Sequence, residues 1–116
     1  MTLEPFTLVL LRRGPRAGEF SDAELDELQA GHLGFLGAMR DQGALAVAGP
    51  FRDQADDTLR GLCLYRTGLE ETRALVAGDP SVQAGRMVAE VLTWLVPEGE
   101  LPLAEGADPP HGEGRG

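Results

Sequence analysis

The segment between Ser21 and Gly43 constrains the fold most, because it marks both ends of one long helix. Ser21 is followed three residues later by Glu24, which is the capping-box pattern of a helix N-terminus. Gly43 is typical of the residue that ends a helix in the left-handed conformation. Six residues between these ends recur at the helical period and form an apolar stripe, namely Leu25, Leu28, His32, Phe35, Leu36 and Met39. We therefore expect a helix through about Gln42 whose apolar side packs against the rest of the fold.

His32 lies at the centre of this stripe, so its imidazole points towards the core or towards a cavity in the core. Spacing alone favours a buried structural histidine with one backbone partner. The functional alternative is an acid–base group, because imidazole titrates near neutral pH. Gly31, Gly34 and Gly37 fall on the opposite side of the helix, where small residues either admit a close neighbour or are merely exposed.

Four short apolar runs, each bounded by glycine, proline or polar residues, predict β-strands. They span residues 6–13, 45–48, 59–66 and 87–95. Thr67 and Glu70 repeat the capping-box spacing and predict a second helix through about Ala77. Asp79 followed by Pro80 predicts a further short helical turn, with the aspartate as its N-cap.

The order strand, helix, strand, strand, helix, strand predicts an α+β fold of the ferredoxin-like type, βαββαβ. Such a fold has a four-stranded antiparallel sheet with both helices on one face. The other face is left uncovered, and this predicts a homodimer that buries sheet against sheet. Residues 1–97 form this domain, whereas residues 98–116 are rich in proline, glycine and acidic side chains and predict a flexible tail.

The net charge of −9 disfavours nucleic acid as a partner, because an acidic chain without a basic cluster repels phosphate backbones. No apolar run is long enough for a membrane span, and no secretory signal is visible at the N-terminus, so a cytoplasmic location is expected. The single cysteine, Cys63, has no partner for an internal disulfide and is interpreted as a small buried side chain.

Two further positions are candidates for contacting a small-molecule ligand. Arg12 lies in a group with Arg13 and Arg16 that could bind an anionic substrate, although a solvated strand end explains the same group more simply. Phe51 follows a Gly-Pro pair and is either a pocket wall or the anchor of a turn.

The chain resembles the YciI-like (YCII-related) family over about residues 5–97. The resemblance is carried by the strand at 6–11, the histidine motif at 32–36, the run at 43–51 that ends in Gly-Pro-Phe, and the Asp-Pro-x-Val-x-Ala-Gly run at 79–85 that leads to Glu90-Val91. It implies a dimeric ferredoxin-like α+β barrel and an active site that contains His32 and Asp79. The family includes a dehydrochlorinase of chlorinated hydroxyquinols, so lyase chemistry is within its range.

A histidine held by a carboxylate suits general acid–base chemistry, because the carboxylate fixes the imidazole tautomer. The resulting hypothesis is a cofactor-free lyase or isomerase in which His32 and Asp79 act on a small metabolite. Two side chains are too few for a metal site, so no metal is expected. The alternative from a different class is a non-catalytic dimeric protein that binds a small ligand or acts as an accessory protein.

Overall fold

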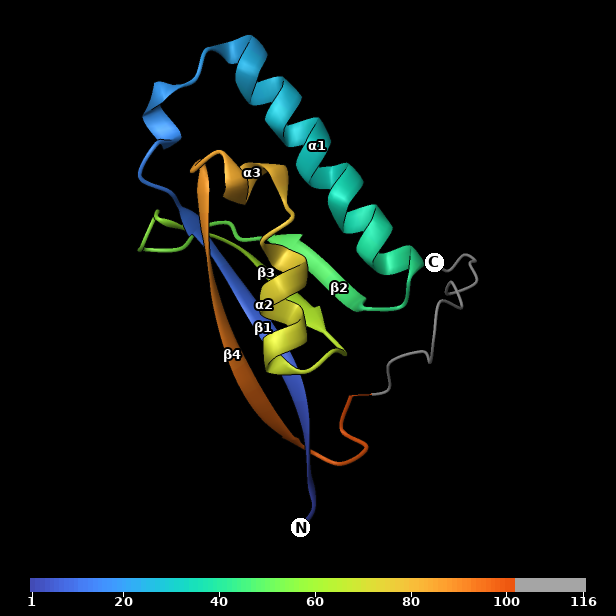
Figure 1. The fold of residues 1–116 in the computed structure, drawn as a ribbon. Coiled ribbons are helices and arrows are strands. Elements are labelled where there is room, and N and C mark those ends of the chain that lie inside the picture. Colours follow the sequence, from blue (N-terminus) through green and yellow to red (C-terminus); the bar gives the residue numbers. More distant parts are fainter. Residues whose placement is uncertain (102–116) are drawn as a thin grey trace, which may run out of the picture.

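The computed structural model describes residues 1–101, and Figure 1 shows the path of the chain. The strands are β1 (Leu3–Arg13), β2 (Leu45–Pro50), β3 (Leu59–Tyr65) and β4 (Met87–Pro97). The helices are α1 (Asp22–Asp41), α2 (Leu69–Val76) and the short α3 (Pro80–Gln83), with a 3-10 turn before α1 at Ala17–Glu19. The flexible tail predicted for residues 98–116 lies outside the described residues from position 102 onward.

These four strands form one antiparallel sheet in the order β2-β3-β1-β4. This order, with the helices along one face of the sheet (Figure 1), confirms the predicted α+β fold with a four-stranded antiparallel sheet, and the topology is ferredoxin-like. β1 and β4 are longer than predicted because their ends pair with each other. Leu3 lies opposite Pro97 and Arg13 lies opposite Met87, so β1 pairs with β4 along its whole length.

α1 begins and ends where the sequence predicts. Ser21 Oγ accepts a hydrogen bond from the Glu24 N–H at 3.2 Å, and the Glu24 carboxylate accepts one from the Ser21 N–H at 2.8 Å. Gly43 has a φ of +82°, the left-handed conformation that glycine adopts at low cost. Neither α1 nor any other helix within residues 1–101 is long and apolar enough to cross a membrane.

The capping box predicted at the start of α2 is wrong. The N-cap of α2 is Gly68, and no side chain caps this helix. Thr67 instead joins a partly buried network, in which its hydroxyl lies 2.7 Å from that of Thr72 and its carbonyl accepts a hydrogen bond from the Thr7 hydroxyl at 2.7 Å. These contacts tie the loop before α2 to α2 itself and to β1, so the Thr67 side chain is not available as a cap.

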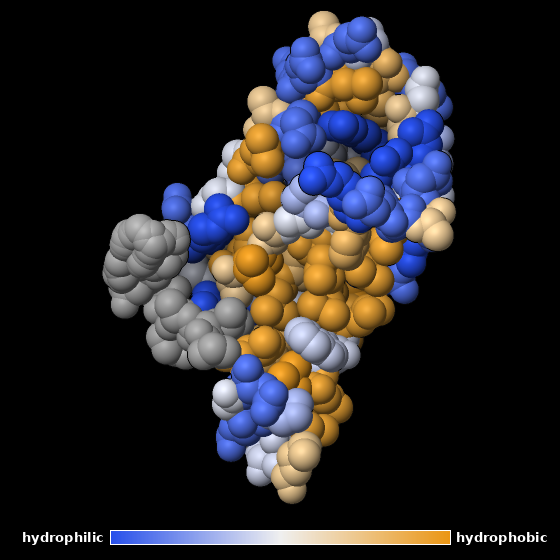
Figure 2. Space-filling view, turned by 180° about the vertical axis from the view of Figure 1, so that it is seen from behind, coloured by the Kyte–Doolittle hydropathy of each residue, from blue (hydrophilic) through white to orange (hydrophobic). Residues whose placement is uncertain are grey.

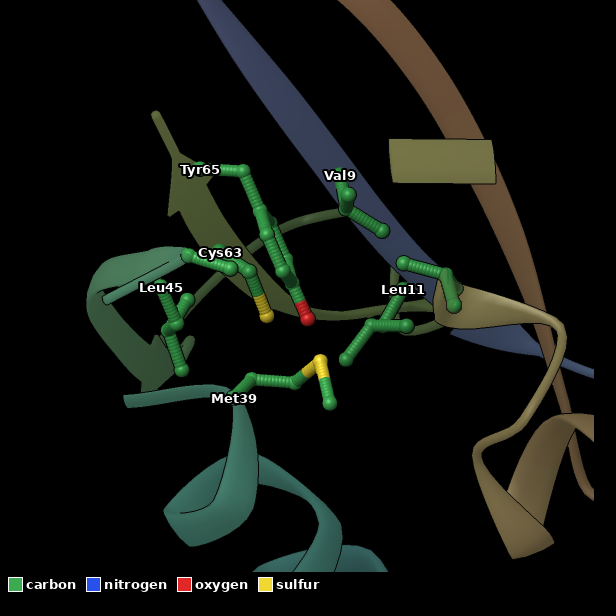
Figure 3. Packing of buried hydrophobic residues seen from close by; sticks show 8 residues of the cluster. Val9, Leu11, Met39, Leu45, Cys63 and Tyr65 are labelled. Atoms are coloured by element: carbon green, nitrogen blue, oxygen red, sulfur yellow. The ribbon is translucent and has the colours of Figure 1, made fainter. Parts of the chain in front are cut away.

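The core lies between the sheet and the helices. Its buried apolar residues are Val9, Leu11, Met39, Ala44, Leu45, Cys63, Tyr65 and Val76. In Figure 3 the sulfur of Cys63 and the hydroxyl of Tyr65 both point towards Met39 of α1. Cys63 is buried, as the sequence predicts. The core therefore packs Met39 of α1 against residues of β1 and β3, and this helps to position the other α1 side chains.

The face of the sheet that points away from the helices is strongly apolar (Figure 2). Side chains of a strand alternate between the two faces, and the register of β4 with β1 places Val88, Leu92 and Trp94 on this face. The exposed fractions of these three residues are 45%, 37% and 42%, and that of Val47, on the same face in β2, is 52%. The predicted homodimer depends on this uncovered apolar face.

Candidate active site

His32 and Asp79 are brought together from two different elements. His32 lies in the middle of α1, and Asp79 is the N-cap of α3, 47 positions later in the chain. The distance between His32 Nδ1 and Asp79 Oδ2 is 2.6 Å. Both residues are buried, with 8% of His32 and 1% of Asp79 exposed. The two candidate residues are therefore in direct contact, whereas a catalytic role for them stays a prediction.

Asp79 is held in place by the start of α3. Its Oδ1 atom accepts a hydrogen bond from the Ser81 N–H at 2.9 Å. Pro80 occupies the first helical position, where its missing N–H is no loss. The Ser81 hydroxyl donates to the Leu28 carbonyl of α1 at 3.4 Å, which adds a weak tie between the two helices. One carboxylate thus caps α3 with one oxygen and contacts His32 with the other.

Gly31 allows α3 to approach α1 closely. A Cβ atom at this position would lie 3.2 Å from Cγ of Pro80 and 3.3 Å from its Cβ, which is tighter than ordinary van der Waals contact. At Gly34 and Gly37 an added Cβ would meet nothing within 4 Å. The sequence left two interpretations open for the three glycines. Gly31 admits a close neighbour, Pro80 of α3, whereas Gly34 and Gly37 face open space.

The contact with Asp79 determines which ring nitrogen of His32 carries a hydrogen atom. When this carboxylate is ionised it only accepts hydrogen bonds, and Nδ1 is then the donor. The other ring nitrogen, Nε2, has no hydrogen-bond partner within residues 1–101. In the neutral ring, Nε2 therefore holds the lone pair that can accept a proton from a bound molecule.

His32 lines a pocket of about 530 Å³ between α1 and the sheet, a volume suited to a small molecule. The apolar part of its lining includes Leu11, Leu25, Leu33, Leu36 and Met87. The polar part includes Gln29, Arg13, Arg40, Arg60 and Arg86. At the pocket and elsewhere in residues 1–101, no three His, Cys, Asp or Glu side chains are grouped so that they could hold a metal ion.

Arg12 does not reach this pocket. It lies on the face of β1 opposite to that of Arg13, and its guanidinium is 3.2 Å from the carboxylate of Asp56 and 3.2 Å from that of Glu90. Arg13, its neighbour in sequence, lines the pocket instead. The structure thus places the anion-binding candidate of the sequence on the wrong side of the sheet and places the adjacent arginine at the site.

Phe51 is likewise not among the residues that line the pocket. Its N–H donates to the Arg60 carbonyl at 2.9 Å, directly after the end of β2. This contact fits the turn-anchor interpretation of Phe51, whereas the preceding residue, Pro50, does line the pocket.

Cys63 lines the pocket but is not activated as a nucleophile. Burial is the main cause that raises the pKa of its thiol to about 11; the Asp79 carboxylate adds to this shift and Arg40 opposes it. Burial also raises the pKa of the Tyr65 hydroxyl, and Cys63 and Asp79 raise it further. Both groups are therefore protonated near neutral pH, and a neutral thiol is a poor nucleophile.

A ferredoxin-like α+β domain with a buried histidine–carboxylate pair beside a small-molecule pocket is the class that this fold and site define. Residues 6–95 match the family of the YCII-related domain, and the chain therefore belongs to that family. This match confirms the resemblance seen in the sequence and covers nearly the same residues.

One solved structure with a similar fold is the 5-chloro-2-hydroxyhydroquinone dehydrochlorinase of Burkholderia phenoliruptrix, in complex with 2,5-dihydroxybenzoquinone. The TM-score is 0.54 and the sequence identity is 20%, and the alignment covers 77% of this chain and 92% of the other. At this level of identity the likeness concerns the fold. Among curated proteins, none matches the chain significantly.

Proposed function

We propose that this protein is a cofactor-free lyase or isomerase that acts on a small metabolite by general acid–base chemistry. The observation that carries the proposal is the 2.6 Å contact between His32 Nδ1 and Asp79 Oδ2 at a pocket that His32 lines. A general base needs a lone pair within reach of the substrate and a partner that fixes its tautomer. His32 Nε2 supplies the first and Asp79 the second.

The proposed reaction starts when His32 Nε2 takes a proton from an acidic C–H or O–H group of the substrate. The Asp79 carboxylate stabilises the imidazolium that forms, because the two groups are in direct hydrogen-bond contact. The proton then returns to another atom, which gives isomerisation, or a leaving group departs, which gives elimination. The fold neighbour named as a dehydrochlorinase, in complex with a quinone, supports an elimination on a small ring.

The proposal includes a homodimer formed through the apolar face of the sheet, which would complete a dimeric α+β barrel. A two-fold interface must be complementary to itself. This face suits a second copy of the chain because its apolar side chains are self-compatible and the Arg12 charge is already paired within the chain with Asp56 and Glu90. Two copies would therefore bring no unpaired Arg12 charge into the interface.

The proposed base is tested by deuterium exchange. Cyclic ketones and hydroxyquinones, including 2,5-dihydroxybenzoquinone, are incubated with the protein in D₂O, and loss of C–H signals is followed by NMR. We expect exchange that His32→Gln slows by about 10²–10⁴-fold and that His111→Gln, the same change at the other histidine, leaves intact. Equal exchange in wild type and His32→Gln would overturn the proposed base. A compound that binds with no exchange would instead support the ligand-binding alternative.

A further inference from the structure

The charged side chains that line the pocket are all arginines. Four arginines line it, and none of its lining residues in the described part of the chain is aspartate or glutamate. This is unexpected in a chain with 19 acidic and 10 basic residues. We infer that the pocket takes a small organic anion, a carboxylate on an apolar body, and that Arg13 and Arg60 bind the carboxylate. The inference names the substrate class for the proposed function and rests on the pocket being its site.

Three of the four arginines come from one end of the sheet. Arg13 ends β1 and lies opposite Met87, the first residue of β4, and Arg86 directly precedes that residue. The Gly14 N–H donates to the Arg86 carbonyl at 2.7 Å, which closes this corner. Arg60 lies at the same end, near the start of β3. The sheet therefore gathers three guanidinium groups that are distant in sequence.

Arg60 reaches the pocket because β3 is irregular at this point. Leu11 pairs with Gly61 but Arg12 pairs with Leu59, so Arg60 is an extra residue between two pairs. A bulge of this kind redirects a side chain from the regular alternation of a strand. The register shift thus accounts for the presence of Arg60 among the residues that line the pocket.

The charges of these arginines are not neutralised by the protein. Within residues 1–101, the side chains of Arg13, Arg40 and Arg60 make no ion pair or hydrogen bond, and Arg86 donates to a neutral group, Gln29 Oε1, at 3.3 Å. Arg12, Arg16 and Arg73, which lie away from this pocket, are all paired with carboxylates. Within residues 1–101, the four arginines of the pocket thus lack a carboxylate partner in the protein, and a ligand carboxylate supplies one.

The rest of the lining requires an apolar ligand body. Leucine side chains from β1 and α1 and Met87 from β4 form an apolar part of the wall, and His32 also lines the pocket. A free phosphate or sulfate would leave this wall in contact with water, whereas a ring or branched chain that carries a carboxylate covers it. The arginines also favour the additional negative charge that develops when His32 removes a proton from such a molecule.

The test compares a carboxylate with its neutral amide. Benzoate and benzamide, and cyclohexanecarboxylate and cyclohexanecarboxamide, are titrated by calorimetry into the full-length protein at low salt. We expect each carboxylate to bind about tenfold more tightly than its amide, as charge-assisted arginine contacts imply. Arg13→Gln/Arg60→Gln should reduce this preference to less than about twofold. Arg12→Gln/Arg52→Gln, which changes the net charge equally but leaves the lining intact, should retain it.

Each outcome decides the inference independently of catalysis. If neither carboxylate is preferred over its amide, or if both double variants behave alike while circular dichroism shows them folded, the anion site is wrong. The same titration on His32→Gln should keep the preference, because this variant leaves both arginines in place. Absence of deuterium exchange in the wild-type protein, with the carboxylate preference intact, contradicts the proposed enzyme alone. Exchange in the wild-type protein without the preference contradicts the anion site alone.

Discussion

The Nδ1 atom of His32 and the Oδ2 atom of Asp79 lie 2.6 Å apart, although the residues are 47 positions apart in the chain. The second oxygen of the same carboxylate caps α3 through the Ser81 N–H. One side chain therefore fixes both the start of a helix and the orientation of an imidazole on another helix. Removal of either function affects the other, so the most informative change at this position is one that keeps the cap and alters only the group that faces His32.

Asp79→Asn is such a change, and we expect it to invert the His32 tautomer. Asparagine caps helices as well as aspartate does. With its oxygen on the Ser81 N–H, its NH₂ group faces His32 Nδ1, which must then accept a hydrogen bond and leave the hydrogen atom on Nε2. Long-range ¹H–¹⁵N NMR of the neutral ring should show Nδ1–H in wild type and Nε2–H in the variant. The same tautomer in both proteins would contradict the assigned contact.

Two glycines of α1, Gly31 and Gly34, should respond differently to substitution by alanine. Gly34→Ala should raise the free energy of unfolding by about 1 kcal/mol, because glycine is that much poorer than alanine in a helix and the new methyl group meets nothing within 4 Å. Gly31→Ala should fall clearly short of this gain, since its methyl group presses against Pro80. Urea unfolding of both variants measures the difference. Equal gains would mean that α1 and α3 are not in tight contact.

Cys63 should be nearly inert to iodoacetamide in the folded protein at pH 8. With a thiol pKa of about 11, about one molecule in a thousand is then ionised, whereas the unfolded chain, with an ordinary pKa of about 8.5, reacts readily. The raised folded-state pKa stabilises the fold below the unfolded pKa, and this contribution is lost as the pH rises towards 11. Labelling rates in buffer and in urea measure the effect. Equal rates at pH 8 would contradict the burial of the thiol.

Local chemistry explains why much of the fold is predictable. The capping box of Ser21 and Glu24 and the stop at Gly43 act within a few residues, and both ends of α1 follow from them. The matching pattern at Thr67 fails because the N-cap of α2 is Gly68, one residue later, and the Thr67 hydroxyl contacts that of Thr72 within α2 instead. A capping motif therefore predicts a helix end only where its hydroxyl is free to bond the backbone of the first turn.

The residues that line the pocket are harder to predict from the sequence than the inward orientation of His32. Residues 8–11 are all apolar, so the sequence does not show which alternate positions of β1 face the helices. Whether Arg12 or Arg13 lies on the side of the pocket depends on that alternation. Arg60 and Arg86 join Arg13 through strand register and a bulge, neither of which leaves a local signal. The His32–Asp79 contact, in contrast, could be expected from the family resemblance.

The proposed homodimer is tested by a charge placed on the apolar face of the sheet. We expect Leu92→Arg to convert a dimer to a monomer in light scattering, because burying an unpaired charge costs about 3 kcal/mol or more, about a hundredfold in the dissociation constant. Leu95→Arg is the matched control, since it changes an exposed leucine of the same strand whose side chain is on the opposite face, and it should stay dimeric. The wild-type protein could prove monomeric even at 100 times the concentration used for light scattering, or the Leu92→Arg variant could remain dimeric. Either result would show that this face has another role. Because both variants add the same charge to β4, a difference between them reports the effect of the sheet face on which the charge lies.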